Sequence, residues 1–482
     1  MASSQRPAAS RLSKRLTALQ DLFGIDCRSL ALFRIGLALV VLFDLTVRAA
    51  DLAAFYTDAG VLPRTSLLSR TPNPWTLSIH LMSGTALVQA ILLGLQGVCA
   101  IGLLLGYRTR WMAILSWFLL ASLQRRNPLI LGGADNYVRM MLFWGMFLPL
   151  GAQWSLEGAL AASPQPRPLR VLSWATAAIL LQTVLIYVIT ALYKWRGETW
   201  QDGSALYYAL NLDLYAREPS AWLLQFPALL KWMTHAVLWF ECLGPFVLFC
   251  PVFTGPIRTV AACGFLLMHL GFNALLYLEL FPAVSATAMT LFLPSWFWDR
   301  VRRRPQPERP VTQQQSLALN AAAAAFLLMV FWVVMAMFMP SRVTMPRPLQ
   351  RFSTLVYLDQ AWKMFAPNPA RVSGWLVVPG VLQDGTRVDV SRGGAPVSWD
   401  KPPRRALFTN ERWRKYLIHF SLKKDRRVWR DYAGYLCRSW NAEHAGDKQL
   451  TSLELVLMAR HTPPAGETAA YNQQSLLRHT CQ

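Results

Sequence analysis

The stretch IYVITALYKWRGETWQDGSALYYAL, residues 186–210, decides how the chain is organised. It completes an uncharged run, residues 171–193, that stops abruptly at Lys194 and is followed by a polar segment rich in Trp and Tyr. About 20 apolar helical residues cross the hydrocarbon core of a bilayer, so this run predicts a membrane-spanning helix. Lys194 is therefore expected where that helix meets water.

Two interpretations of Lys194 follow from this position. In the first, the lysine is an anchor whose alkyl stem lies in lipid and whose ammonium group reaches the head groups. In the second, the amine is partly removed from water, which favours its neutral form and makes it a base. Lysines at membrane interfaces are common as anchors, so position alone favours the first interpretation.

The composition of the whole chain indicates a polytopic α-helical membrane protein. Of its 482 residues, 54% are hydrophobic and only 15% are charged, and several long runs carry few or no charges. A net charge of +22 is also typical of nucleic-acid-binding proteins. Here, however, the basic residues cluster at helix ends and in short loops, where membrane topology and anionic lipid explain them. We therefore expect the lipid bilayer, and no nucleic acid, as a partner.

Nine candidate spans divide the chain into three parts. We predict spans at residues 30–49, 79–105, 111–123, 137–153, 171–193, 233–251, 258–278, 281–298 and 317–339. The three parts are a basic tail (1–29), an all-α transmembrane bundle (30–340) and a small soluble α+β domain (341–482).

The positions of the basic residues predict the orientation in the membrane. They gather in the N-terminal tail and in the loops after the second, fourth, sixth and eighth spans, most densely at residues 300–309. By the positive-inside rule this side is cytoplasmic, and an odd number of spans places the C-terminal domain outside. Arg125, Arg126, Lys194 and Arg196 fall on the outer side against the rule, which makes them better functional candidates than the cytoplasmic arginines.

Polar side chains inside the spans form the candidate site, because such groups are costly in lipid and by default face the bundle interior. Arg34 and Asp44 lie about 15 Å apart along the first helix, so each needs a partner elsewhere. His269 and Asn273 are four residues apart, hence on one helical face. The candidates for substrate binding are Arg34, Asp135, Asn136, Arg139 and Glu241. Each of these is equally open to being a structural hydrogen-bond partner.

The C-terminal domain shows both strand and helix patterns. Residues 374–391, GWLVVPGVLQDGTRVDVS, predict two short strands around a turn at Asp384 and Gly385. Apolar residues from Trp413 to Phe420 recur on one helical face, and a second helix is predicted to begin near Asp425. LTSLELVLMAR then alternates like a strand.

Motifs for several familiar chemistries are absent from the sequence. The seven cysteines include no C-x-x-C pair and no Cys/His ligand spacing, so no metal site is predicted. Cys437 and Cys481 are a candidate disulfide if their domain lies outside the cytoplasm. There is no Gly-rich phosphate loop, no H-E-x-x-H and no G-x-S-x-G elbow. These patterns leave both an enzyme and a factor that handles a partner open.

Four sequence blocks occur in an order that resembles a known family. They are LALFRIGLALVVLFDLTVRAADLAAFYTDAGVLPR (30–64), LFWGMFLPLGAQWSLEG (142–158), IYVITALYKWRGETW (186–200) and LLMHLGFNALLYLELFPAVSATAMTLFLPS (266–295). Together they resemble the horizontally transferred transmembrane (HTTM) domain, which is similar to the membrane part of vitamin K-dependent γ-glutamyl carboxylase. AWKMFAPNPARVSGWLVVPGVLQDGTRVDV (361–390) resembles the segment that follows this domain in bacterial members. The resemblance implies a bacterial cytoplasmic (inner) membrane protein.

The resemblance also implies a set of catalytic residues and a cofactor. In the carboxylase, a lysine at the end of the matching helix is the proposed base that drives quinol oxygenation, and that position is Lys194 here. His269 and Asn273 also match by position, and a hydrogen-bonding group there can steady a quinone oxygen. The implied cofactor is a reduced, vitamin K-like quinone without a metal, and a secreted peptide or protein is the candidate substrate.

Departures from the family keep other functions open. Where the carboxylase and many bacterial relatives carry an Asn-His-Tyr-like motif, this chain reads GGADNYVRMM, with Asp135 or Asn136 in place of the histidine. The C-terminal domain is also much shorter than the carboxylase region that binds propeptide and glutamate. The leading hypothesis is a carboxylase-like enzyme that acts on a membrane quinol or lipid with Lys194 as general base. The rivals are a non-catalytic factor for peptide maturation, export or immunity, and a lipid-interacting protein anchored by Lys194.

Overall fold

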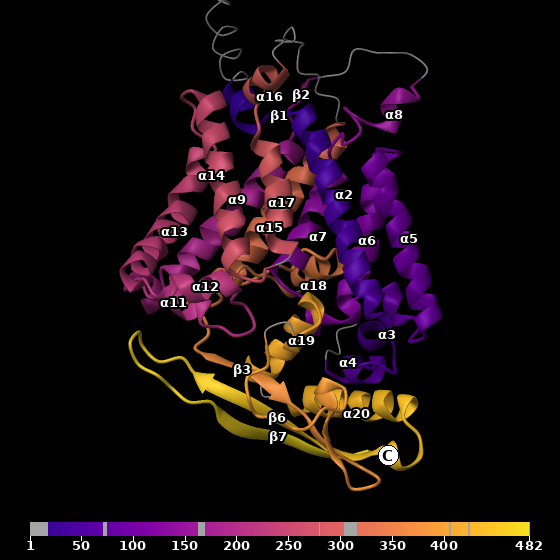
Figure 1. Cartoon of the computed structure of the whole chain (residues 1–482). Helices are drawn as coiled ribbons and strands as arrows, with labels where there is room; N and C mark the ends of the chain where they lie inside the picture. The colour runs from indigo at the N-terminus through magenta and orange to yellow at the C-terminus, as the bar shows by residue number, and fades with distance from the viewer. Residues whose placement is uncertain are drawn as a thin grey trace, which may run out of the picture.

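The structure is a computed structural model in which long helices form one bundle and a small domain covers one end of it (Figure 1). The described residues are 18–70, 75–161, 169–278, 280–302, 316–403, 406–422 and 425–481. The first 17 residues and most of the predicted basic loop at 300–309 lie outside this description. The described chain is mostly helical, with a small sheet region near its C-terminus, which agrees with the predicted fold class.

Five helices are long and apolar enough to cross a membrane. They are α2 (Cys27–Ala50), α5 (Ala86–Leu105), α9 (Trp174–Lys194), α14 (Thr254–Leu275) and α17 (Leu317–Phe338). At a rise of 1.5 Å per residue, each covers about 30 Å, the thickness of the hydrocarbon core. Large apolar side chains stay exposed on their outer surfaces, for example Leu95 on α5 and Leu270 on α14. These helices indicate a multi-pass membrane protein.

Four further helices complete the bundle, and they are shorter or more polar. They are α6 (Thr109–Arg126), α7 (Gly133–Gly145), α13 (Pro227–Val247) and α15 (Leu280–Met289). The predicted spans 79–105 and 137–153 are too long, because α5 begins at Ala86 and the chain leaves helical geometry soon after α7, before Pro149. The span predicted at 281–298 is broken by a 94° bend before α16. Five of the nine predicted spans therefore meet the length and composition of a full crossing, or six if the bent pair counts as one.

Short elements close the two ends of the bundle (Figure 1). At the end remote from the C-terminal domain lie β1 (Ile25–Asp26), α8 (Leu156–Ala159), β2 (Arg170–Val171) and α16 (Ser295–Arg302). At the end that faces this domain lie α3 (Leu52–Tyr56), α4 (Arg64–Arg70), α11 (Ala205–Leu210), α12 (Glu218–Leu223) and α18 (Arg347–Leu355). A single turn of helix, α10 (Glu198–Gln201), connects α9 to α11.

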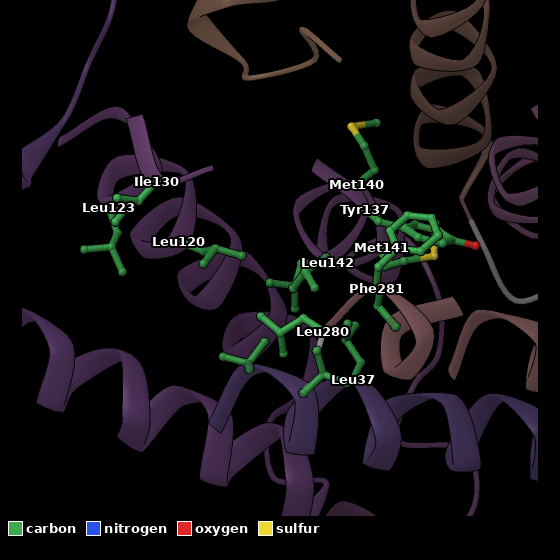
Figure 2. Packing of buried hydrophobic residues seen from close by; sticks show 14 of the residues in the cluster. Leu37, Leu120, Leu123, Ile130, Tyr137, Met140, Met141, Leu142, Leu280 and Phe281 are labelled. Carbon is green, nitrogen blue, oxygen red and sulfur yellow. The ribbon is translucent and has the colours of Figure 1, made fainter. Parts of the chain in front are cut away.

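The apolar core of the bundle surrounds α7. Leu37 of α2 and Met140 and Leu142 of α7 are fully buried, and Figure 2 shows these side chains among their neighbours. The rings of Tyr137 on α7 and Phe281 on α15 lie 6.1 Å apart between centroids. Irregular backbone is tolerated at membrane depth only where protein covers it. Because α7 lies at the centre of the bundle, it can be much shorter than the membrane is thick.

The C-terminal domain is an antiparallel sheet with two helices. Both helices and the strand at 450–461 were predicted, but three strands form where two were predicted at 374–391, and β7 was not predicted. Its elements are β3 (Val372–Val377), β4 (Pro379–Leu382), β5 (Arg387–Asp389), α19 (Glu411–Leu422), α20 (Arg426–Glu443), β6 (Leu450–His461) and β7 (Asn472–Thr480). The strand order is β3-β6-β4-β5, and β7 pairs with β6. Gly385 has a φ of +82°, as the predicted turn between β4 and β5 requires. The predicted disulfide is confirmed, since Cys437 of α20 is bonded to Cys481 after β7.

Four buried charges join this domain to the bundle. Asp44 and Arg48 come from α2, Asp135 from α7 and Arg412 from α19. Arg48 Nη2 lies 2.5 Å from Asp135 Oδ1, and Arg412 Nη1 lies 2.9 Å from Asp135 Oδ2. Asp44 pairs with both arginines, and its Oδ2 is 2.7 Å from Arg48 Nε. Two positive and two negative charges cancel, which makes their burial tolerable.

Replacement of Arg412 by alanine leaves two buried carboxylates with one cation. We expect Arg412→Ala to lower the free energy of unfolding by about 3–5 kcal/mol, the range for breaking a buried ion pair. The midpoint of thermal unfolding in detergent measures this loss. Arg427→Ala, which removes an arginine whose side chain is 59% exposed on α20, is the matched control and should behave like the wild type. Equal midpoints for the two variants would contradict the importance of the four-charge cluster.

Candidate functional site

A cavity of about 500 Å³ lies between the bundle and the C-terminal domain. Volumes of this size are typical of sites for small molecules and cofactors. Its apolar wall includes Leu206, Ala209, Phe272, Leu276 and Phe281. Its polar groups include Asp135, Asn136, Lys194, Glu241, His269, Arg412, Arg414 and Lys415. The predicted Lys194, His269, Asp135, Asn136 and Glu241 therefore meet at one cavity.

Lys194 is the last residue of α9 and points into the protein. Its Nζ lies 2.6 Å from Glu241 Oε2, and its side chain is only 4% exposed. The same ammonium group is 4.2 Å from the centroid of the Trp200 ring, which adds a cation–π contact. This geometry does not fit an anchor whose ammonium group reaches the lipid head groups.

Glu241 reaches Lys194 from the neighbouring helix α13. Thr234, Leu238 and Glu241 are all buried, and their spacing of four and three residues puts them on one helical face. An isolated ion in a protein interior costs several kcal/mol, whereas a hydrogen-bonded pair of opposite charges offsets much of that cost. Glu241 is thus first of all the group that makes the burial of Lys194 possible.

His269 forms a second polar pair with Tyr187. His269 Nε2 on α14 lies 2.7 Å from Tyr187 Oη on α9, and both residues are 2% exposed. Tyr187 lies seven residues before Lys194, about two helical turns, so the two side chains share one face of α9. Asn273, one turn beyond His269, does not line the cavity, and its Oδ1 lies 3.4 Å from Arg217 Nη2.

The predicted residues Asp135 and Asn136 lie at the start of α7 and play different parts. The Asp135 carboxylate is occupied by Arg48 and Arg412, and it also accepts a hydrogen bond of 2.7 Å from the Gly132 backbone N–H. Asn136 lines the cavity, and its amide makes no hydrogen bond to the described part of the chain. Asn136 is therefore the one of the two that is available to a ligand.

Two other predicted residues lie away from the cavity. Arg34 donates hydrogen bonds to the carbonyl oxygens of Leu150 (3.1 Å) and Trp154 (2.6 Å), on the bundle side remote from the C-terminal domain. Arg139 donates to Gln124 Oε1 at 2.6 Å and to the Tyr357 carbonyl oxygen at 3.0 Å. Both guanidinium groups tie separate segments together.

The C-terminal domain supplies a wall of the cavity that the sequence analysis missed. Arg414 Nε lies 3.0 Å from Glu411 Oε2, and Lys415 Nζ is 3.7 Å from the same carboxylate. The Arg414 guanidinium group lies 4.2 Å from the ring centroid of Tyr215. Burial raises the pKa of Tyr215, but Lys415 and Arg414 lower it more, so the pKa lies below its ordinary value. The sequence signal for this wall was the basic run Arg-Trp-Arg-Lys at 412–415. It lies in a helix for which only the apolar face was considered.

A segment without regular secondary structure, residues 359–369, also borders the cavity. Lys363, Met364 and Phe365 line it, and Trp200 Nε1 donates a hydrogen bond of 3.0 Å to the Phe365 carbonyl oxygen. A Cβ atom at Gly197 would lie 1.8 Å from the Pro367 carbonyl oxygen, so only glycine allows this close approach. The segment is thus held against the loop that follows Lys194.

The arrangement suits a flat, mostly apolar ligand with polar groups at its edges. Paired polar groups, Lys194 with Glu241 and Tyr187 with His269, sit beside apolar surface in the same cavity. Such convergent polar groups on an apolar wall are typical of cofactor sites. Among the described residues, no three His, Cys, Asp or Glu side chains gather as metal ligands.

Comparisons with known proteins return no match. No protein-family model, no curated protein and no solved structure matches the chain. The resemblance in the sequence blocks therefore stays a prediction, and the geometry of the cavity is the main guide to function.

A double-mutant cycle tests whether Lys194 and Glu241 act as one neutral pair. We expect Lys194→Met and Glu241→Leu each to lower the free energy of unfolding by about 3–5 kcal/mol, because each leaves a buried charge without its partner. The double variant should recover most of this loss, as read from thermal unfolding in detergent.

The exposed pair Lys448 and Asp384 is the control for this cycle, with side chains 62% and 28% exposed. Its coupling energy should stay below about 1 kcal/mol. Additive losses at Lys194 and Glu241 would show that the two side chains are not coupled.

Proposed function

We propose that this chain is an HTTM-family enzyme of the bacterial cytoplasmic membrane that removes a proton from a ring hydroxyl of a membrane-dissolved quinol. The general base is Lys194, and the chemistry is that of a γ-carboxylase-like quinol epoxidase. Molecular oxygen is the oxidant, with one of its atoms entering the epoxide and the other leaving as water. The observation that carries the proposal is the buried ion pair of Lys194 and Glu241 at a largely apolar cavity of about 500 Å³. The resemblance of the four sequence blocks to the carboxylase supports it.

Glu241 solves the main chemical difficulty, which is that an ammonium group cannot act as a base. Transfer of one proton from Lys194 Nζ to Glu241 Oε2 across 2.6 Å converts the ion pair into a neutral amine and a neutral acid. This transfer removes both charges at once, and with them the desolvation cost that the buried ion pair bears. The neutral amine then accepts the proton of a ring hydroxyl, and the developing negative charge lies beside the resulting ammonium group.

The cavity fits a quinol in its other groups as well. Phe272 and Leu276 offer apolar surface to a ring and its tail, and the Thr190 hydroxyl is buried without a hydrogen bond to any described residue. A reduced quinone, when bound, supplies an acidic ring hydroxyl and two electrons. The residues that would hold it are Lys194, Tyr187 and His269.

The wall from α19 supports a secreted peptide or protein as the second substrate. Arg412 is balanced within the four-charge cluster, but Arg414 and Lys415 share the single carboxylate of Glu411. The wall from α19 therefore keeps one positive charge in excess, and Lys363, which also lines the cavity, adds a second. This excess favours an acidic group on the substrate.

We propose that the chain crosses the membrane nine times, as predicted from the sequence, with this cavity on the outer side. β1 pairs with β2, so α2 and α9 begin at the same end of the bundle, as four intervening crossings by α2, α5, α6 and α7 require. Arg258 near the start of α14 donates to the Asp21 carbonyl oxygen at 3.1 Å, as two further crossings require. The Cys437–Cys481 disulfide supports an outside location for the C-terminal domain, because such bonds persist in oxidising compartments.

Loss of the Lys194 amine should abolish turnover of a reduced quinone. We expect Lys194→Ala to lower the rate by a factor of about 10²–10⁴, the usual contribution of a general base. Lys194→Arg should not restore it, because arginine cannot be deprotonated in proteins. The change in ultraviolet absorbance of a short-chain menaquinol, incubated in air with purified protein in detergent, measures the rate.

Lys231→Ala removes an exposed lysine of α13 and is the matched control, with a rate close to wild type. If folded Lys194→Ala turns over the quinol within twofold of wild type, the base proposal fails and a non-catalytic factor becomes the better function. Lys194→Arg with full activity would lead to the same conclusion.

The orientation predicts the behaviour of reporters fused after Gln482. Alkaline phosphatase, which needs an oxidising compartment, should be active there, and a green fluorescent protein exported through the same pathway should be dark. The wild type should differ in mobility between reducing and non-reducing gels, and the double replacement Cys437→Ser and Cys481→Ser should remove this difference. A phosphatase that is inactive and a fluorescent protein that is bright would reverse the orientation.

A further inference from the structure

Tyr187 and His269 form a polar pair on the cavity wall that the proposed proton transfer does not use. The distance from Tyr187 Oη to His269 Nε2 is 2.7 Å. The two residues belong to different helices, and both are part of the cavity wall. Around them the wall is aromatic, since the rings of Phe281 and Phe272, which both line the cavity, lie 5.7 Å and 6.2 Å from that of His269.

The hydrogen bond between the two side chains has two possible directions. A neutral imidazole donates from one ring nitrogen and accepts at the other, and a partner on one nitrogen usually decides which. His269 Nδ1 is buried and makes no hydrogen bond within the part of the chain that the structure describes. The tautomer of His269 is therefore not fixed by a hydrogen bond at Nδ1. Tyr187 can donate to Nε2 and keep its oxygen as an acceptor, or accept from Nε2–H and keep its O–H as a donor.

The position of this pair along α9 suits a ring that also reaches Lys194. Seven residues separate Tyr187 from Lys194, which corresponds to about 10 Å along the helix axis. Side chains of a helix generally tilt toward its N-terminus, a tendency that shortens this gap, and Lys194 and Tyr187 line the same cavity. Thr190 lies between them on the same face and also lines the cavity.

We infer that Tyr187, supported by His269, binds the second oxygen of the ring ligand, the one remote from Lys194. The inference rests on the proposed function, because it takes a quinol as the ligand. The reduced ring presents a hydroxyl, which donates to the Tyr187 oxygen while Tyr187 donates to Nε2. The oxidised ring presents a carbonyl, which accepts from Tyr187 O–H while His269 Nε2–H donates to Tyr187. The ligand exchanges no proton or electron with this pair. Between the two arrangements one proton moves within His269, from Nδ1 to Nε2, so the site holds both redox forms.

Infrared difference spectra of bound duroquinone, a tetramethylated benzoquinone, test the assignment. In the wild type we expect two distinct carbonyl bands, each shifted from its frequency in detergent by a hydrogen bond. Tyr187→Phe should return one band to the unbound frequency, and Lys194→Met should return the other. Because one hydrogen bond is lost, Tyr187→Phe should weaken the binding of duroquinone and of duroquinol alike, by up to about tenfold.

Tyr137→Phe is the matched control, because Tyr137 is also a fully buried tyrosine but does not line the cavity. It should leave both bands and both affinities unchanged. Tyr187→Phe can also leave both bands and both affinities unchanged while Lys194→Met moves one band. In that case Tyr187 and His269 are only a contact between helices, and the proposed function stands. If only one redox form binds more weakly, the switching of the tautomer is wrong. A wild type without any bound duroquinone band would overturn both proposals.

Discussion

A charge buried in a low dielectric is tolerated only beside its opposite, and this constraint governs how the bundle and the C-terminal domain fit together. Asp44 and Asp135 supply the two carboxylates that Arg48 contacts. The second cation that balances them is Arg412, which belongs to the C-terminal domain. The same rule joins Lys194 on α9 to Glu241 on α13. Both clusters contribute side chains to the cavity, so its polar groups are also the points at which the architecture is held together.

Local patterns in the sequence carried much of the fold. The uncharged run before Lys194, the turn at Asp384 and Gly385 and the apolar face from Trp413 to Phe420 each report on a few neighbouring residues, and all three appear as predicted. The predicted lengths of the spans were wrong where tertiary packing determines how long a helix is. The central position of α7 permits a helix of 13 residues where hydropathy predicted a longer crossing.

The sequence identified several residues of the candidate site, but it did not show which of them contact one another. Lys194, His269 and Glu241 stand out because ionisable groups in apolar runs need a reason. Nothing local reveals that Glu241 is the partner of Lys194, or that Tyr187 bonds His269, since these contacts join residues far apart in sequence. The arginine-rich face of α19 was visible, but its place at the cavity depends on the docking of a whole domain. Arg34 shows the converse, a buried charge whose hydrogen bonds go to backbone carbonyl oxygens.

The four-charge cluster also has a consequence for biogenesis. A growing chain delivers Asp44, Arg48 and Asp135 to the membrane long before Arg412 is synthesised, and these three groups together carry one negative charge in excess. The nascent bundle is therefore electrostatically incomplete until the C-terminal domain has been made and has docked. A chain that ends before residue 412 keeps this unmatched negative charge, because it lacks Arg412. Because the C-terminal domain is synthesised last, the charges of α2 stay unbalanced until this domain docks.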